Sequence, residues 1–250
     1  MKKLTSTLLM ALVALSMTAC GSRNQDNTQN APTETGTVTE ESVGGSEKGT
    51  EENAQSSAEA QDTSQGGGSS ILIAYFSVME TDGVDTVAGA SRVAVNGELL
   101  GNNQYIAQLI QQETGGDLFS IETVQEYPTT HDPLLEFAYN EKAENARPEL
   151  ATEIENLDSY DVIFLGFPNW NADLPMPLYT FLETYDFSGK TIIPFTTHGG
   201  SGFSRTIQTI EELQPNATVI SDGLSISRNS VSGAESEVAD WVNGLNLTVE

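Results

Sequence analysis

The chain has 250 residues, with 10 Lys and Arg against 36 Asp and Glu, and a formal net charge of −26 at pH 7. Because like charges repel at long range, this balance argues against nucleic acid and anionic membrane surfaces as direct partners. From Ile71 onward there are 6 basic and 27 acidic residues, so the acidity is not confined to a tail. It either attracts a basic partner or only keeps an exported protein soluble.

The first 20 residues have the layout of an export signal. Lys2 and Lys3 precede the apolar stretch 8–15, which is too short to span a bilayer, and small residues precede Cys20. Cys20 is the only cysteine, which excludes an internal disulfide. Its position directly after Ala19 resembles a bacterial lipobox. That resemblance implies a signal peptide at 1–19, lipidation of Cys20 and a membrane lipoprotein that faces outside the cytoplasm. The alternative is ordinary secretion with a chance cysteine.

Residues 20–70 are predicted to be a disordered acidic linker. They are rich in Ser, Thr, Gly, Gln, Asn and Glu, and Val38 and Val43 are almost the only large apolar residues. Such a segment buries too little surface to offset its ordering entropy. We therefore expect a tether between the lipid anchor and a folded domain at 71–250.

The folded domain is predicted to alternate strands with helices. Short apolar runs predict strands at 71–77, 117–123, 161–167, 190–196 and 218–226. Helices are predicted at 103–113, 136–146, 175–185, 204–213 and 234–245, and a turn or another helix at 148–157. The alternation predicts a doubly wound parallel α/β sheet with helices on both faces.

The long connection 78–100 interrupts this pattern. Within it, Val93 and Val95 alternate with polar residues, and Asn96-Gly97 suits a two-residue hairpin turn. We predict a small inserted β-hairpin, which either decorates the fold or forms a lid or docking surface.

Three of the predicted strands are followed by loops rich in hydroxyl, amide and glycine residues. Because the carboxyl ends of parallel strands lie at one edge of a sheet, these loops should converge there. The first loop supplies Ser77, Gly101, Asn102, Asn103, Gln104 and Tyr105, the second supplies Pro168, Asn169 and Trp170, and the third supplies Thr196, Thr197, His198, Gly199, Gly200, Ser201 and Gly202.

Each loop offers a different part of a flavin site. Ser77, Asn103 and the start of the helix after Gly101 offer hydroxyl, amide and backbone donors to a phosphate. Trp170 is expected to stack on the flavin ring, although a core tryptophan is the alternative. The glycine-rich turn allows backbone amides to approach the ring edge. His198 could face the ring or cap the next helix, and His131 could approach the same rim.

These loops, with the order of strands and helices, resemble the flavodoxin family, in particular flavodoxin-like domains of bacterial lipoproteins, over residues 71–247. The resemblance implies a five-stranded sheet of order 2-1-3-4-5 that binds FMN noncovalently. It also implies electron transfer with a redox partner, either a protein with a basic surface or a small-molecule acceptor.

Two other functions stay open. The domain could be an FMN-dependent NAD(P)H:quinone or small-molecule reductase, or a non-redox binding lipoprotein that has lost its flavin. No zinc constellation, Walker loop or nucleophile elbow is present in the sequence, so we predict no metal site and assign no catalytic residue. Trp241 is expected to pack in the core.

Overall fold

The computed structural model describes residues 70–82 and 92–247. The predicted signal peptide, the lipidation of Cys20 and the linker lie outside these residues. Within the described ranges, no helix is long and apolar enough to cross a membrane. The strands are β1 (Ile71–Tyr75), β2 (Arg92–Val95), β3 (Glu98–Gly101), β4 (Asp117–Ser120), β5 (Val162–Pro168), β6 (Thr191–His198), β7 (Thr218–Val219) and β8 (Leu224–Ser227). The α-helices are α1 (Asn102–Thr114), α2 (His131–Glu144), α3 (Met176–Thr184), α4 (Thr206–Leu213) and α5 (Glu235–Gly244), and single 3₁₀ turns lie at Leu157–Ser159 and Val231–Gly233.

The main sheet is parallel, with the strand order β4-β1-β5-β6-β7 and β8 also paired with β6. In chain order, this arrangement is the predicted order 2-1-3-4-5, so the doubly wound fold is confirmed. Sequence patterning explains why both faces are covered. Alternate side chains of a strand point to opposite faces, and all of Ile71, Leu72, Ile73 and Ala74 are buried.

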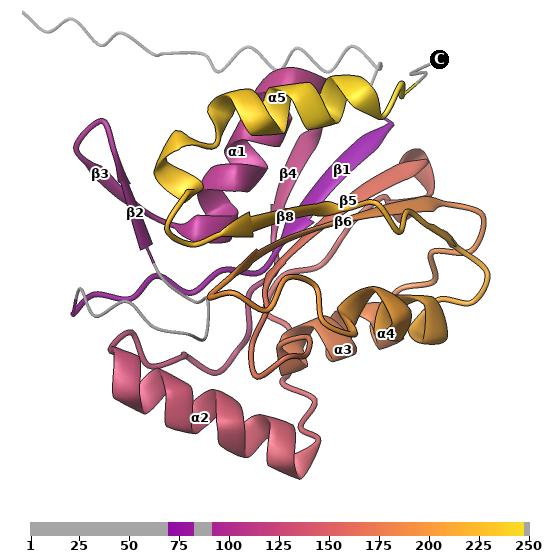
Figure 1. Cartoon of the computed structure of the whole chain (residues 1–250). Coiled ribbons are helices and arrows are strands. Elements are labelled where there is room, and N and C mark those ends of the chain that lie inside the picture. The colour runs from indigo at the N-terminus through magenta and orange to yellow at the C-terminus, as the bar shows by residue number, and fades with distance from the viewer. Residues whose placement is uncertain (1–69, 83–91, 248–250) are drawn as a thin grey trace, which may run out of the picture. The chain divides into compact units, whose positions relative to one another are not determined.

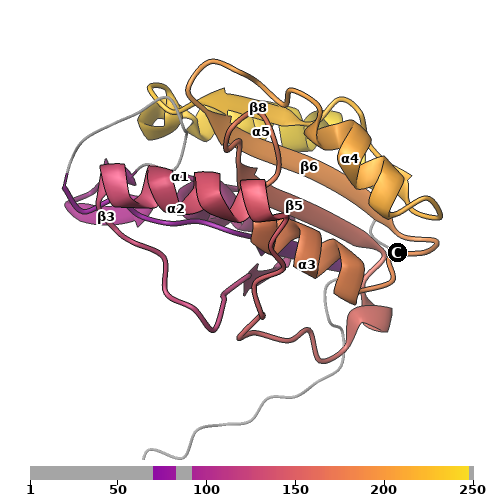
Figure 2. The same cartoon turned by 90° about the horizontal axis from the view of Figure 1, so that it is seen from below.

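Helices cover both faces of the sheet (Figure 1). Ile71 and Ile73 belong to the core cluster that includes buried residues of α1 and α5, whereas Leu72 and Ala74 belong to the cluster that includes residues of α3. Seen from below, α2 runs across the same side of the sheet as α3 and α4 (Figure 2).

The predicted hairpin is confirmed as β2 and β3, which pair antiparallel. Asn96 and Gly97 have φ angles of 52° and 86°. Positive φ at both central residues is what a two-residue turn of the twist-matched type requires. Residues 83–91 of the predicted insertion lie outside the described ranges.

The prediction for α2 is wrong at its start. The sequence predicted a helix at 136–146, yet α2 begins at His131 and contains Pro133. Pro133 lies in the first turn, where a backbone N–H would have no intrahelical acceptor, so the missing donor costs little. Asn145, with φ 52°, ends the helix in the left-handed conformation.

The fifth predicted strand is divided in two. β7 pairs with Thr191 and Ile192, and β8 pairs with β6 from Phe195 onward, so residues 220–223 stand opposite only two residues of β6. One of these is Pro194, which has no backbone N–H to give to a neighbouring strand. Gly223 passes so close to the carbonyl oxygen of Pro194 that a Cβ would overlap it.

Candidate functional site

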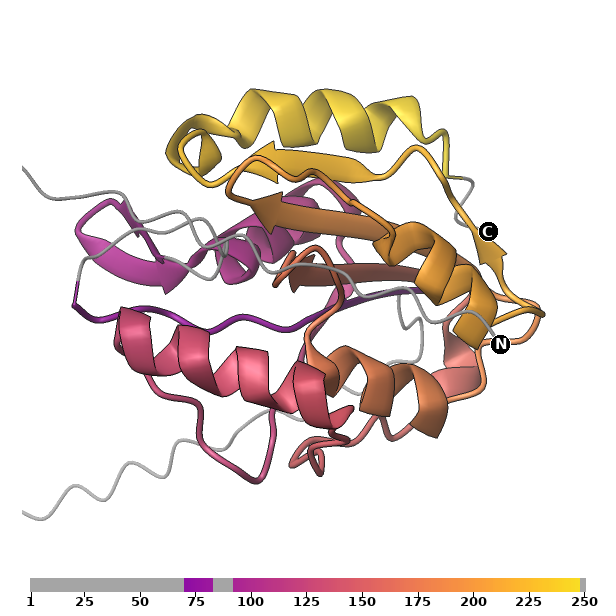
Figure 3. The ribbon, with the colours of Figure 1, turned by 60° about the horizontal axis from the view of Figure 1, so that its bottom comes forward.

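The sheet register brings the three predicted loops together. The backbone N–H of Phe76 donates to Gly166 O at 2.9 Å, which carries the β1–β5 ladder past the end of β1. The N–H of Asn169 donates to Thr197 O at 2.9 Å and links β5 to β6 in the same way. β5, β6 and β8 end at one edge of the sheet (Figure 3). The edge expected for a ligand therefore carries all three loops.

The first loop is compact at the start of α1. The N–H of Gly101 donates to the Gln104 side chain at 3.2 Å. A Cβ on Gly101 would overlap Ser77 Oγ, so only glycine fits beside this hydroxyl. The first backbone N–H groups of a helix lack intrahelical acceptors, and they favour an anion such as a phosphate. The loop thus sets a serine hydroxyl beside these donors.

Asn103 connects the first loop to the third. Its Nδ2 donates to Thr197 Oγ1 at 2.9 Å in a buried contact. The sequence suggested that this amide donates to a phosphate, whereas the structure uses it to hold the loops together. Asn103 Oδ1 is buried and has no hydrogen-bond partner among the described residues. A ligand hydroxyl could supply the missing donor.

Asn169 holds the second loop against the glycine turn. Its Nδ2 donates to Gly202 O at 2.5 Å and lies 3.1 Å from Ser204 Oγ. Gly200 and Gly202 have φ angles of 131° and 56°, a region that glycine adopts without steric cost. The turn shape therefore depends on glycine and on a buried amide. Asn169 Oδ1 is also buried without a partner within the described ranges.

Trp170 is buried, with 4% of its surface exposed. Its ring meets Phe76 edge-on, with centroids 5.5 Å apart, and lies 5.8 Å from the ring of Tyr127. These contacts agree with the core role that the sequence left open, and stacking on a flavin stays a prediction. Trp170 Nε1 is a buried donor without a described acceptor.

The segment after Trp170 is a tight turn that the sequence did not reveal. Asn171 and Ala172 have φ angles of 54° and 59°, and Trp170 and Asp173 form a bridge across them. Lys142 of α2 donates to Asn171 O at 2.8 Å and pairs with Asp173 at 3.1 Å. The left-handed backbone conformation is strained for an alanine such as Ala172. The contacts with Lys142 therefore stabilise a turn that the sequence alone disfavours.

His198 lies at the end of β6. Its Nδ1 accepts the N–H of Gly200 at 2.9 Å, so it supports the glycine turn. Burial lowers the pKa of His198 from its ordinary value of 6.5. The imidazole is therefore neutral at pH 7, as an acceptor nitrogen requires.

Two other predicted site residues are engaged inside the fold. The hydroxyl of Tyr105 donates to Glu235 of α5 at 2.6 Å, and burial, with this carboxylate, raises the pKa of Tyr105 to about 12. The Thr196 hydroxyl donates to Phe167 O at 2.7 Å. That these two residues contact a ligand stays a prediction. Pro168 is the last residue of β5, and Gly199 directly follows β6.

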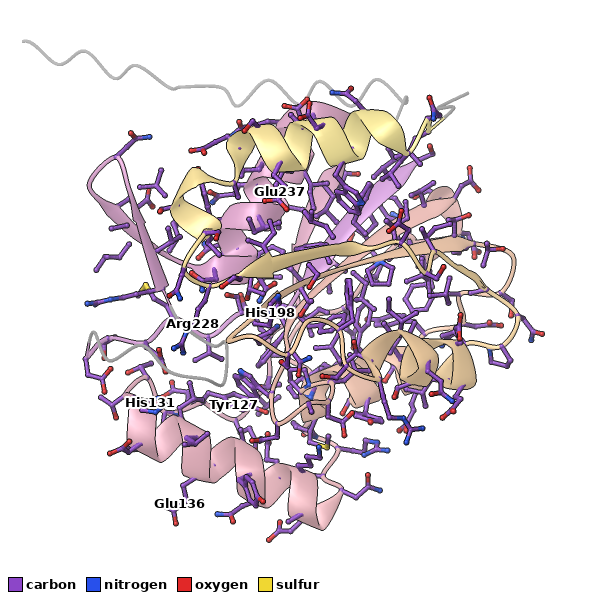
Figure 4. The ribbon with its side chains drawn as sticks, viewed as in Figure 1. Tyr127, His131, Glu136, His198, Arg228 and Glu237 are labelled. Carbon is purple, nitrogen blue, oxygen red and sulfur yellow. The ribbon has the colours of Figure 1, made fainter. Side chains whose placement is uncertain are left out.

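The structure adds residues to this edge that sequence reasoning missed. Arg228 follows β8, and its N–H donates to His198 O at 2.9 Å. Figure 4 shows Arg228 and His198 on one side of the edge, and His131 and Tyr127 on the other. His131 forms a close pair with Glu80, 51 residues earlier in the chain. The sequence had suggested that His131 could approach this rim, but pattern alone gave no signal for Arg228 or for the partner Glu80, because their contacts join distant segments. Among the described residues, no group of three or more His, Cys, Asp and Glu could hold a metal.

At this edge, Asn103 Oδ1, Asn169 Oδ1 and Trp170 Nε1 are buried polar atoms without a partner among the described residues. Asn103 belongs to the first loop, and Asn169 and Trp170 belong to the second, while hydrogen bonds to Thr197 and Gly202 join both loops to the third. Buried polar atoms are nearly always hydrogen-bonded, so such a set is typical of a place that a polar ligand completes. The hydroxyl-bearing side chain of a flavin and its polar ring match these atoms.

Comparison with known proteins establishes the family. The family model described as Flavodoxin matches residues 70–245, and the chain belongs to the flavodoxin family. No curated protein matches the chain. The fold is also shared with proteins assigned as flavoproteins. One from Bacteroides eggerthii is 24% identical, with 72% of this chain and 99% of that chain covered and a TM-score of 0.51. One from Bacteroides uniformis is 23% identical, with 71% and 99% covered and a TM-score of 0.53.

A third similar structure is a flavoprotein from Lactobacillus acidophilus in complex with FMN. It is 20% identical, with 69% of this chain and 98% of that chain covered and a TM-score of 0.46. The family and the fold together define this chain as a flavodoxin-like protein whose edge suits a flavin cofactor.

Gly101→Ala should weaken FMN binding by at least about tenfold, or about 1.4 kcal/mol. The added methyl displaces the Ser77 hydroxyl from the start of α1. Because a serine side chain can rotate, the free energy of unfolding should change little. Gly233→Ala is the matched control, since its methyl would meet nothing within 4 Å. Equal FMN affinity in the two variants, measured by fluorescence titration, would remove Ser77 from the site.

Acid should release the glycine turn. Burial lowers the pKa of His198, so its Nδ1 takes up a proton only as the pH falls below about 6.5. A protonated Nδ1 can no longer accept the hydrogen bond from the Gly200 N–H. The Gly200 amide resonance of the flavin-free protein should then shift, while it stays constant above neutral pH. In His198→Asn, the side-chain oxygen can accept at every pH, and the resonance should not move. A resonance that is also constant in the parent protein would contradict this role.

Proposed function

We propose that this chain is an FMN-binding electron-transfer protein that a lipid anchor at Cys20 tethers outside the cytoplasmic membrane. The observation that carries the proposal is the set of unpartnered buried atoms of Asn103, Asn169 and Trp170, on two neighbouring loops that meet at one sheet edge. Family membership supports a flavin as the molecule that completes them. The sequence of residues 1–20 supports export and anchoring.

FMN would be held mainly by donors rather than by cations. The first N–H groups of α1 and the Ser77 hydroxyl would take the phosphate. Asn103 and Asn169 would accept hydrogen bonds from the hydroxyl-bearing chain, and the Gly199–Gly202 turn would lie at the ring edge. The bound flavin supplies the redox chemistry, and the protein orients it and sets its electrostatic surroundings.

The acidic surface supports a basic redox partner. Residues from Ile71 onward carry a formal charge of −21. Such a field accelerates encounter with a positively charged protein, and salt weakens the effect. A small-molecule acceptor is the other partner considered, whereas nucleic acid would be repelled.

A reductase is the second candidate function, and one observation favours it. The Glu80–His131 pair lies close to Trp170 around a shared cavity, where it could move protons during reduction of a small molecule. Steady-state oxidation of NAD(P)H by the FMN-loaded protein with a quinone separates this activity from an electron carrier. If the purified protein is colourless and does not take up FMN, the third candidate would be favoured, which is a non-redox binding lipoprotein that has lost its flavin.

FMN should bind at one per chain, and riboflavin should bind at least about tenfold more weakly, because only FMN has a phosphate for the start of α1. FMN should also quench tryptophan emission through Trp170. Trp170→Phe should remove most of this quenching, whereas Trp241→Phe, which alters a ring packed 5.7 Å from Phe164, should retain it.

Titrations with both flavins, followed by absorbance and emission, test these expectations. Equal affinity for riboflavin and FMN would refute the phosphate site. Unchanged quenching in Trp170→Phe would place the flavin away from this tryptophan.

A further inference from the structure

Beside the candidate flavin site, the buried carboxylate of Glu80 pairs with the partly buried imidazole of His131. His131 Nδ1 lies 3.0 Å from Glu80 Oε1, and the two side chains are 12% and 2% exposed. A buried carboxylate is costly unless an opposite charge or a hydrogen bond compensates it. The Nδ1 proton of His131 supplies that hydrogen bond.

The pair is held by the backbone on both sides. Thr81 donates its N–H to Thr129 O at 2.7 Å, and Asp82 Oδ2 accepts the N–H of His131 at 2.7 Å. These contacts fix the segment after β1 against the first turn of α2. The distance between the imidazole and the carboxylate is therefore set by the fold, not by two freely rotating surface side chains.

The pair also faces Trp170. A cavity of about 10 Å³ is lined by Glu80, His131, Leu134, Leu135, Ala138, Trp170 and Asn171. That volume suits about one water molecule and is too small for a substrate. Its apolar walls keep the local dielectric low, so a change of charge at the flavin site acts strongly on the pair. The cavity thus favours proton exchange, not ligand binding.

Other charged groups lie around the pair on each element that packs against it. His131 Nε2 lies 3.8 Å from Asp132 Oδ1 on α2, and Asp82 contacts the backbone from the segment after β1. Arg92 of β2 donates to Thr81 O at 3.2 Å. Lys142 of α2 and Asp173, which lies in the turn after Trp170, form an ion pair in which their charges cancel. Among the described residues, the groups that face the imidazole ring itself are acidic.

We propose that His131, supported by Glu80, takes up one proton when the neighbouring flavin is reduced by two electrons. The proposal rests on the proposed FMN function. The electrons come from an external reductant, and two protons come from water. One proton binds the flavin, and the other binds His131 Nε2, where the imidazolium lies between Glu80 and Asp132. Reoxidation returns both electrons to the acceptor and both protons to solvent. The pair thereby offsets the negative charge that reduction adds inside an acidic protein.

The experiment counts protons. The full chain in detergent micelles, loaded with FMN, is photoreduced near pH 7 in weak buffer with an indicator dye, and a flavin-free sample corrects for the photoreductant. The parent should take up close to two protons per two electrons. His131→Gln should take up close to one, because glutamine can still hydrogen-bond to Glu80 but does not titrate. Glu80→Gln should also take up fewer than the parent. Glu136→Gln alters an exposed carboxylate of α2 that Figure 4 shows away from His131, and this variant should match the parent.

The outcomes separate the two proposals. A His131→Gln protein that binds FMN and takes up as many protons as the parent overturns the role of the pair and leaves the FMN function intact. If both His131→Gln and Glu80→Gln fold but bind no FMN, the pair is a structural support, and the proton role is likewise overturned. A parent that does not bind FMN refutes the proposed function and the inference with it.

Discussion

The candidate site depends on the register of three neighbouring parallel strands. β1, β5 and β6 end within a few residues of one another, and the contacts Phe76–Gly166 and Asn169–Thr197 continue the ladders into the loops. The buried hydrogen bond from Asn103 to Thr197 then joins the start of α1 to the end of β6. A shift of one residue in any of these strands would turn the loop side chains to the other face. The same strand register therefore fixes both the packing of the sheet core and the geometry of the site.

The protein and its proposed ligand carry charge of the same sign. FMN is an anion, and from Ile71 onward acidic residues outnumber basic ones 27 to 6. The fold resolves this conflict locally, since helix N–H groups and hydroxyls bind a phosphate without a nearby lysine. Arg228 and the Glu80–His131 pair place groups that carry or can accept positive charge at the same edge. Long-range acidity can then act on a partner while short-range donors act on the cofactor.

The sequence predicted the layers and the hairpin well, because continuous apolar runs and the Asn96-Gly97 dipeptide are local signals. The strand order came from the resemblance to the flavodoxin family, since local signals do not set it. Prediction from the sequence failed where tertiary contacts override local rules. Pro133 sits inside the first turn of α2, and the fifth strand divides opposite Pro194. The loops of the site were found from their composition. The pairings within them were not, because Asn103 and Thr197 are 94 residues apart, and only the folded sheet brings them together.

Amide hydrogen exchange with and without ligand tests most directly whether this edge holds FMN by its phosphate and ring. The account predicts that FMN slows exchange at the first turn of α1, from Asn102 to Gln104, and in the turn from Gly199 to Gly202. Riboflavin, which lacks the phosphate, should slow exchange in the glycine turn but leave the first turn of α1 unchanged. Protection by FMN at neither segment, or equal protection of α1 by both flavins, would contradict the account.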